Sequence, residues 1–229
     1  MNLQTLTDRG RSRAENQDNY WSAIAEVDGV EHGVVCLCDG MGGLKNGGEA
    51  SRIVAQSVKD YLAKNFDFEG LRGVIEEANA RVNSIGGTSK ETMMGTTCSI
   101  LMVSEGVYRV LHVGDSRVYL IRGGRAYRIT EDHSAVVALR IDRKKEPERW
   151  LKYRSKLTRC IGAKDVVKPD YYEGRYIPGD TFFLCSDGVW HTFDDNPLSD
   201  ADLTDLAALF ERCMSEGEND NLTACILQI

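Results

Sequence analysis

The spacing of apolar positions changes several times along the chain, and it predicts which segments are strands and which are helices. Residues 34–38 are all apolar, which is typical of a strand buried on both faces. Beyond Gly48 the apolar positions recur at intervals of three and four, as on one face of an amphipathic helix. After residue 95 the chain returns to strand-like runs. The pattern therefore predicts groups of strands with helices between them.

Applying these two periods to the whole chain gives a list of expected elements. Strands are expected at residues 3–8, 20–26, 34–38, 96–103, 108–113, 117–122, 126–129, 167–172, 181–186 and 222–229, and helices at 50–62, 71–85 and 201–214. The polar segment 141–156 predicts an exposed helix or helix pair, interrupted at Pro147. The strands between residues 96 and 129 predict a meander, in which neighbours are antiparallel.

The order of these elements favours one fold class. No linker, repeat or low-complexity tract divides the chain, so we expect a single domain over residues 1–229. Antiparallel runs with helices grouped between them argue against a doubly wound parallel sheet. We expect an α+β fold with two packed antiparallel sheets flanked by helices.

Composition and charge exclude several function classes. A net charge of −7 argues against a nucleic-acid-binding surface. No apolar run approaches the roughly 18 residues of a membrane span, and no secretory signal precedes the first polar stretch. Seven cysteines without Cys-x-x-Cys spacing indicate a reducing compartment, and the pair Cys36 and Cys38 is too small for a zinc site. We expect a cytoplasmic protein with neither nucleic acid nor membrane as a partner.

Five acidic residues lie at strand ends or beside glycine: Asp18, Asp39, Asp115, Asp187 and Asp220. Any one of them alone is as readily a turn residue. If the strand ends converge, the like charges repel unless cations neutralise them. Oxygen ligands without histidine or cysteine favour Mg²⁺ or Mn²⁺ over zinc. A carboxylate that bridges two such ions is the arrangement of two-metal phosphate ester hydrolysis.

A basic loop precedes the first of these carboxylates. Arg9, Arg11 and Arg13 lie within five residues. The loop is either simply solvated or provides a bidentate grip on phosphate, for which arginine is well suited.

Seven short motifs occur in a fixed order: RAENQD (13–18), CDGMGG (38–43), GTT (95–97), VGDSR (113–117), TEDHS (130–134), CSDGVW (185–190) and NDNLT (219–223). In this order they resemble the metal-dependent protein phosphatases, the protein phosphatase 2C-like Ser/Thr phosphatases, in their compact bacterial form. The resemblance spans about residues 3–229. It implies a four-layer α-β-β-α sandwich with metals in a cleft at one end.

The resemblance also implies the ligands of two core Mn²⁺ or Mg²⁺ ions. Asp39 would bridge the two metals, and the carbonyl of Gly40 would bind one of them. Asp187 and Asp220 would complete the shell of the other metal. Asp18 would act at the second metal, mainly through ordered water.

Two further residues match family positions. Asp115 matches the position that holds a third, weaker metal, and Arg13 resembles the phosphate-binding arginine. The implied reaction is hydrolysis of phosphoserine and phosphothreonine in proteins, in opposition to a Ser/Thr kinase. A hydroxide that bridges the metals would attack phosphorus in line.

The chain departs from the family pattern at three places. Met41 stands where animal-type members carry a histidine proposed to protonate the leaving group, and Gln17 replaces a glutamate that some members use as a metal ligand. The basic segment 140–150 replaces a glycine-containing loop. It is either a solvated helical face or a substrate-selecting lip beside the metal cleft. For His133 we expect a helix-capping or packing role.

Two alternatives remain open at this point. The chain could be a catalytically silent phosphoprotein-binding regulatory module of the same fold, although such modules usually lose metal carboxylates and all five are present here. It could also keep the chemistry with a different substrate, such as phosphoarginine or a phosphorylated anti-anti-sigma protein.

Overall fold

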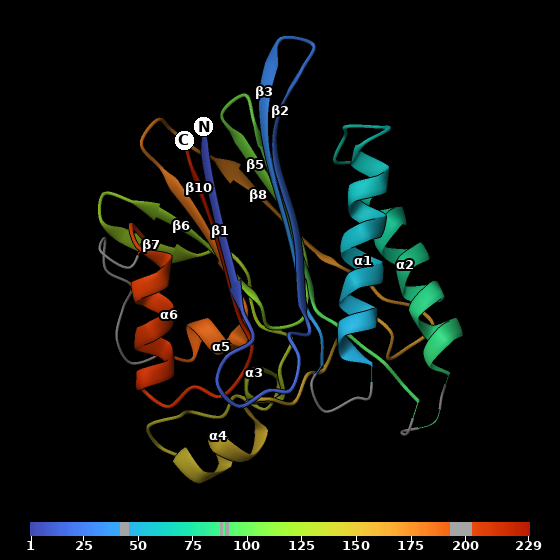
Figure 1. The fold of residues 1–229 in the computed structure, drawn as a ribbon, viewed down its shortest axis with the longest axis vertical. Coiled ribbons are helices and arrows are strands. Elements are labelled where there is room, and N and C mark those ends of the chain that lie inside the picture. Colours follow the sequence, from blue (N-terminus) through green and yellow to red (C-terminus); the bar gives the residue numbers. More distant parts are fainter. Residues whose placement is uncertain (42–45, 88, 90–91, 193–202) are drawn as a thin grey trace.

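The computed structural model describes residues 1–41, 46–87, 89, 92–192 and 203–229 (Figure 1). Within these residues ten strands form two five-stranded antiparallel sheets. The first sheet has the order β1 (Asn2–Asp8), β10 (Leu222–Gln228), β9 (Thr181–Cys185), β6 (Arg117–Arg122) and β7 (Arg125–Arg128). The second has the order β2 (Asp18–Val27), β3 (Val30–Asp39), β4 (Cys98–Ser104), β5 (Val107–Val113) and β8 (Asp170–Arg175).

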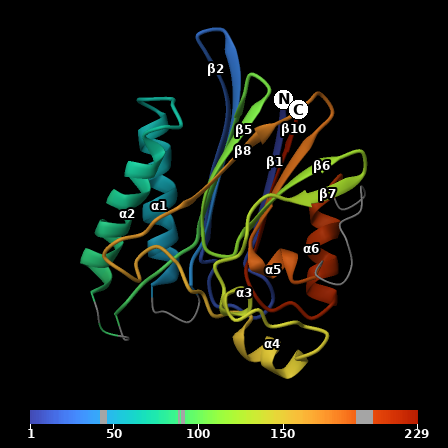
Figure 2. The ribbon, with the colours of Figure 1, turned by 180° about the vertical axis from the view of Figure 1, so that it is seen from behind.

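Helices cover the outer faces of the two sheets (Figures 1 and 2). The pair α1 (Gly47–Leu62) and α2 (Leu71–Gly86) covers the second sheet, and α5 (Asp187–Trp190) and α6 (Leu206–Ser215) lie beside the first. The short helices α3 (Ala135–Ala138) and α4 (Pro147–Tyr153) lie at one end of the sandwich. The prediction of two antiparallel sheets flanked by helices is confirmed.

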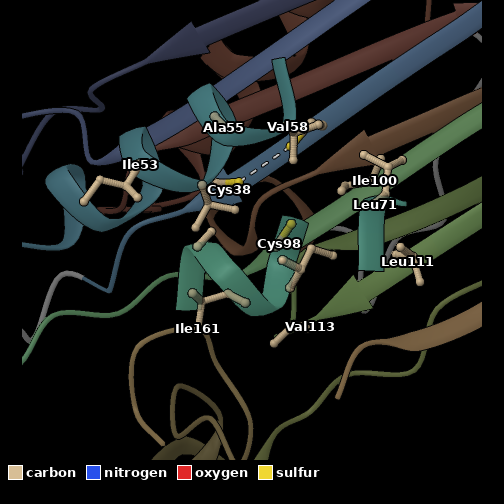
Figure 3. Packing of buried hydrophobic residues seen from close by; sticks show 14 of the residues in the cluster. Cys38, Ile53, Ala55, Val58, Leu71, Cys98, Ile100, Leu111, Val113 and Ile161 are labelled. Atoms are coloured by element: carbon tan, nitrogen blue, oxygen red, sulfur yellow. Dashed lines mark hydrogen bonds between the residues drawn. The ribbon is translucent and has the colours of Figure 1, made fainter. Parts of the chain in front are cut away.

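Strand β3 shows why an unbroken apolar run was needed here. Val35 and Leu37 pack between the two sheets, whereas Val34, Cys36 and Cys38 pack under the helices. All five side chains are 0% exposed. Figure 3 shows part of the layer under the helices, where Cys38 lies near Val58 of α1 and Cys98 of β4. Burial on both faces leaves no position for a polar side chain until the strand ends.

The meander predicted between residues 96 and 129 is wrong in one respect. Strands β5 and β6 are consecutive in sequence but belong to different sheets. The chain crosses between the sheets at Gly114, whose φ of +113° is disfavoured for any residue with a side chain. A Cβ atom at this position would lie 2.5 Å from Cγ2 of Thr97. The corner that results carries Asp115.

Smaller differences concern helix ends. Pro147 begins α4 instead of interrupting a helix, which agrees with the preference of proline for the first helical turn. The short helix α5 was not predicted. The helix predicted at 201–214 begins later, at Leu206, because residues 203 and 204 form a turn and Asp205 caps the helix. Residues 201 and 202 lie outside the described residues, as do residues 42 and 43 of the second motif. None of the described helices has the length and hydropathy of a bilayer-spanning segment.

Candidate metal and phosphate site

Five strand or helix termini bring the predicted carboxylates to one end of the sandwich. Asp18 begins β2 and Asp39 ends β3, and the two residues are direct partners in the antiparallel ladder. Asp187 is the first residue of α5, two residues after the end of β9, and Asp220 lies two residues before β10. Asp115 lies in the corner between β5 and β6.

A cleft of about 350 Å³ collects these side chains. It is lined by Arg13, Asp39, Met41, Thr97, Asp115, Ser155, Leu157, Asp187 and Asp220. Asp18 is not among the lining residues, because its side chain is buried behind the cleft and only 6% exposed. The structure therefore gathers four of the predicted carboxylates and Arg13 in one cavity, with the fifth carboxylate directly behind it.

The surroundings of Asp18 leave one of its oxygens without a partner. Thr223 Oγ1 donates a hydrogen bond of 2.7 Å to Asp18 Oδ2. Asp18 Oδ1 is buried and has no hydrogen-bond partner among the described residues. A buried carboxylate oxygen without a partner destabilises the folded state unless a cation or a water molecule binds it.

Burial and mutual repulsion disfavour ionisation of the carboxylates. Burial, followed by the charges of Asp18, Asp187, Asp115 and Asp220, raises the pKa of Asp39 well above its usual range. Burial also raises the pKa of Asp115 well above its usual range, raises that of Asp187, and raises that of Asp18 to about 7. Only positive charge within the cleft can keep all of these groups ionised at neutral pH.

The residues present fit divalent cations. The candidate ligands are carboxylate oxygens, which Mg²⁺ and Mn²⁺ prefer, and Asp18 supplies an unsatisfied oxygen. Among the described residues, no three of these carboxylates place ligand atoms within 4.8 Å of one another. The fit to divalent cations therefore rests on the carboxylate donors and on the unpartnered oxygen of Asp18.

Gly40 allows three segments to approach closely at the end of β3. Its N–H donates to the carbonyl oxygen of Gln17 at 3.2 Å, and it pairs with Thr96 in an isolated β-bridge. A Cβ atom on Gly40 would lie 2.4 Å from Gly47 O and 2.5 Å from Gln17 O. Any side chain at this position would push the loop that carries Arg13 away from β3.

Arg13 faces the carboxylates from the loop between β1 and β2. Its Nη2 lies 2.6 Å from Asp220 Oδ2, and its side chain is 39% exposed. The hydrogen bond with Asp220 raises the pKa of Arg13. The guanidinium is thus held at the rim of the cleft with part of its donor edge open to solvent, which suits phosphate binding.

Two residues that position the site were not predicted. Asn221 accepts a hydrogen bond from Gln17 N at 2.9 Å and donates to Arg9 O and Glu15 O, so it fastens the Arg13 loop to the start of β10. Thr97 Oγ1 accepts a 2.9 Å hydrogen bond from Asp39 N. Both lie in motifs quoted above, but nothing in the sequence indicates which distant backbone each would bind.

The three departures from the family pattern have distinct surroundings. Met41 lines the cleft beside Asp39 and offers no proton. Gln17 donates from Nε2 to Glu15 at 2.7 Å and uses its carbonyl oxygen to hold Gly40. The third departure, the basic segment around α4, contributes Arg143, Arg154 and Ser155 to the lining of a larger cavity of about 720 Å³.

His133 has a packing role, one of the two roles expected for it. Its Nδ1 accepts a hydrogen bond from Gly114 N at 3.0 Å, and its Nε2 lies 2.9 Å from Asp170 Oδ2. The ring therefore joins the corner that carries Asp115 to strand β8. From α5, Trp190 supports the same corner by donating from Nε1 to Asp115 O at 2.8 Å.

Cys98 adds a third thiol to the predicted pair Cys36 and Cys38. The three sulfur atoms lie within 4.8 Å of one another, and all three residues are 0% exposed. Burial raises the pKa of the Cys38 thiol well above its usual range, so it packs as a neutral apolar group. Sequence spacing missed this cluster because Cys98 joins it only through the pairing of β3 with β4.

Comparisons with known proteins place these observations in context. A family model described as protein phosphatase 2C matches residues 9–227. Protein phosphatase PhpP of Streptococcus pneumoniae is 29% identical over 247 residues, covering 100% of this chain and 98% of that protein. The serine/threonine phosphatase Stp1 from Staphylococcus aureus superposes with a TM-score of 0.83 at 28% identity, covering 99% of this chain and 94% of that one. The PPM Ser-Thr phosphatase MsPP from Mycobacterium smegmatis gives 0.81 at 29% identity, covering 100% and 98%.

Proposed function

The chain belongs to the protein phosphatase 2C family, and on this premise we propose that it is a metal-dependent protein phosphatase acting on phosphoserine and phosphothreonine. The observation that carries the proposal is the cleft of about 350 Å³, where Asp39, Asp115, Asp187 and Asp220 face Arg13. A phosphoryl group needs positive charge on its oxygens and a nucleophile opposite its leaving group. Carboxylates able to hold two cations, with an arginine beside them, provide a place for both.

The carboxylates are assigned as metal ligands. Asp39, which lines the cleft, would hold cations together with the Gly40 carbonyl, Asp187 and Asp220. Asp18 supports the site from behind through its unpartnered oxygen. Mn²⁺ or Mg²⁺ bound there would supply charge for the phosphoryl oxygens and a nucleophilic water. Asp115 is placed to hold a third, weaker ion.

Arg13 orients the substrate. Its guanidinium already contacts Asp220 at 2.6 Å, so a phosphoryl group entering the cleft meets both the arginine and the ion-binding carboxylates. Bidentate hydrogen bonds to two phosphoryl oxygens would fix the phosphorus for in-line attack. Because Met41 cannot donate a proton, the leaving alkoxide takes its proton from water.

The biological setting follows from the same reasoning. The substrates would be phosphorylated proteins, and the enzyme would oppose a Ser/Thr kinase. All seven cysteines are free and buried in the structure, in keeping with a reducing cytoplasm.

A phosphopeptide assay tests the proposal. We expect turnover of phosphoserine and phosphothreonine peptides with Mn²⁺ or Mg²⁺, much weaker turnover of phosphotyrosine peptides, and no turnover after chelation. A silent binding module would instead bind phosphopeptides without releasing phosphate, in any of these conditions.

Substitution of Arg13 tests its assigned role separately. Arg13→Ala should raise KM about tenfold through loss of a charge-assisted contact, while calorimetry shows unchanged metal affinity. Arg11→Ala is the matched control, because Arg11 lies in the same loop but pairs with Glu211 instead. Lost metal binding in Arg13→Ala would show that Arg13 supports the metal ligands rather than the substrate.

A further inference from the structure

We propose that Glu218 is a positioning residue of the candidate metal site, which links the backbone of Asp220 to the helix that carries Asp187. The inference rests on the proposed phosphatase function, because Asp187 and Asp220 are among its assigned metal ligands. It goes beyond that function by giving a role to a residue outside the seven motifs, immediately before the last of them.

The end of α6 determines where Glu218 lies. Gly217 follows the helix with a φ of +95°, a conformation that favours glycine. Its N–H donates to Met214 O at 3.4 Å, and the N–H of Glu218 donates to Cys213 O at 3.1 Å. This pair of hydrogen bonds is the Schellman arrangement, which satisfies the last carbonyl groups of a helix. The backbone of Glu218 is therefore fixed independently of its side chain.

One carboxylate oxygen of Glu218 binds the backbone of the segment that carries Asp220. Its Oε1 accepts hydrogen bonds from Asn219 N at 2.8 Å and from Asp220 N at 3.0 Å. Hydrogen bonds to a carboxylate are stronger than those to a neutral acceptor. Glu218 thus holds Asp220 by its backbone, while Arg13 contacts the carboxylate of Asp220 at 2.6 Å.

The other carboxylate oxygen of Glu218 faces the helix that carries Asp187. Oε2 lies 3.3 Å from Nδ1 of His191, and the two side chains are only 14% and 8% exposed. The N–H of His191 donates to Asp187 O at 3.0 Å, one turn earlier in the chain. The ring of His191 packs against Trp190 in a T-shaped arrangement with centroids 4.3 Å apart. Glu218 therefore contacts both segments that supply these assigned metal ligands.

These contacts are those of a positioning residue rather than of a metal ligand. Both oxygens of Glu218 are engaged within the protein, whereas Asp18 has a buried oxygen without a partner among the described residues. Removing a group that orients metal ligands typically lowers metal affinity by roughly 10- to 100-fold. We therefore expect Glu218 to act on metal affinity through Asp220.

The same cavity provides a matched control. Glu216 and Glu218 both line the cavity of about 720 Å³ that contains Asp187 and Asp220. Glu216 is 44% exposed and lies 3.8 Å from Arg212 on its own helix. Glu216→Ala therefore removes a negative charge from this cavity without removing the acceptor for Asp220 N.

Mn²⁺ binding by two variants of similar size tests the inference without any substrate. Glu218→Met removes the acceptor and should weaken Mn²⁺ binding, measured by electron paramagnetic resonance, by about tenfold. Glu218→Gln is equally neutral but keeps an oxygen for Asn219 N and Asp220 N, so it should stay within about threefold of the wild type. Glu216→Ala should bind Mn²⁺ as the wild type does.

Turnover of a simple aryl phosphate separates positioning from damage to the fold. Because Glu218 acts through the metal ligands, Glu218→Met should need about tenfold more Mn²⁺ for half-maximal turnover. At saturating Mn²⁺ its kcat should return to within about threefold of the wild type. If circular dichroism shows that Glu218→Met is partly unfolded, Glu218→Ala removes the same acceptor and is held to the same expectations.

A double-mutant cycle tests the link to the helix of Asp187. His191→Ala removes the group that faces Oε2 of Glu218 and should weaken Mn²⁺ binding by about threefold. In His191→Ala/Glu218→Met the loss should stay near tenfold, because the two residues act through one contact. A loss of about thirtyfold, the product of the two separate losses, would overturn this link.

The outcomes distinguish this inference from the proposed function. Equal Mn²⁺ affinity in Glu218→Met and Glu218→Gln, or equal losses in Glu218→Met and Glu216→Ala, overturns the positioning role while phosphatase activity stands. A Mn²⁺ affinity that depends on the acceptor at Glu218 supports the positioning role even if no phosphopeptide is hydrolysed, a result that would overturn the proposed function.

Discussion

Removing divalent cations at pH 7.5 should lower the stability of this protein, because the metal-free fold disfavours ionisation of its buried carboxyl groups, which ionise freely in the unfolded chain at this pH. Asp18 allows the magnitude to be worked out. Burial raises its pKa to about 7, roughly 3 units above the value in an unfolded chain. Keeping Asp18 ionised in the metal-free folded state at pH 7.5 therefore costs about 4 kcal/mol.

The sign of this effect sets its pH dependence. A carboxyl group whose pKa is raised on folding stabilises the fold where it is protonated, below about pH 4, and this stabilisation is lost as the pH rises towards 7. At pH 5.5 the same group costs only about 2 kcal/mol. Asp18 should therefore lower the free energy of unfolding of the metal-free protein most strongly near neutral pH and above.

Thermal unfolding in Mn²⁺ and in a chelator measures the effect. For a chain of this length about 4 kcal/mol corresponds to a change in Tm of roughly 10 °C. In the chelator at pH 7.5, Asp18→Asn should melt above the wild type, because asparagine can still accept the hydrogen bond from Thr223 without carrying a charge. This difference should shrink by about half at pH 5.5, and comparing two proteins at each pH cancels the titration of other groups. A wild-type Tm that does not respond to chelation, or a difference that is equal at both pH values, would refute the reasoning.

Three further predictions concern the framework around the cleft. Burial lowers the pKa of His112 to about 3, so its contribution to stability is present above pH 6.5 and is lost as the pH falls. Urea unfolding should show that His112 lowers the free energy of unfolding by about 2 kcal/mol at pH 5 relative to pH 7.5. His112→Gln should remove this part of the pH dependence. Arg117→Met leaves Asp132, which is 4% exposed, without its main ion pair and should lower the free energy of unfolding by about 3 kcal/mol. Arg117→Met/Asp132→Asn should recover at least half of this loss. An equal loss of stability in both variants would contradict the role of the buried ion pair. Gly188→Ala would place a Cβ atom 2.2 Å from Asn221 O. We therefore expect the free energy of unfolding, measured in urea, to fall by at least about 2 kcal/mol, and Mn²⁺ binding measured by calorimetry to weaken. Unchanged values would show that the backbone can adjust.

Much of the fold could be predicted because local patterns determine it. The run at residues 34–38 identified a strand buried on both faces, and the structure places its side chains alternately in two apolar layers. The change of sheet at Gly114 could not be predicted in the same way. Two strands joined by a short corner have the same local pattern whether they pair with each other or enter different sheets. Only the packing of both sheets decides between these alternatives.

The candidate site shows the same division. Asp39 and Asp187 were recognisable because each follows an apolar strand and precedes a glycine. The contacts of Asn221 could not be recognised from the sequence, since this residue binds backbone atoms of Arg9, Glu15 and Gln17, which lie more than 200 positions away. A hydrogen bond of this kind depends on the pairing of β1 with β10, which no short-range pattern encodes.

The basic segment around α4 was predicted with two open interpretations. Its charge pattern alone fits a solvated helical face. The structure adds the position of Arg143 and Arg154 in the wall of the cavity beside Asp187 and Asp220, and the contact of both with Trp150. These contacts depend on how the segment folds back over the end of the sandwich, which is tertiary information.

The most direct test of the metal-site assignment is turnover of a simple aryl phosphate by Asp39→Asn and Asp187→Asn. Each should lose at least about a thousandfold in Mn²⁺-dependent turnover while its circular dichroism stays that of the wild type, because the substitution removes a metal-binding charge without changing side-chain shape. Asp60→Asn, at an exposed position of α1, is the matched control and should retain full activity. Undiminished Mn²⁺-dependent turnover in Asp39→Asn and Asp187→Asn would contradict the account.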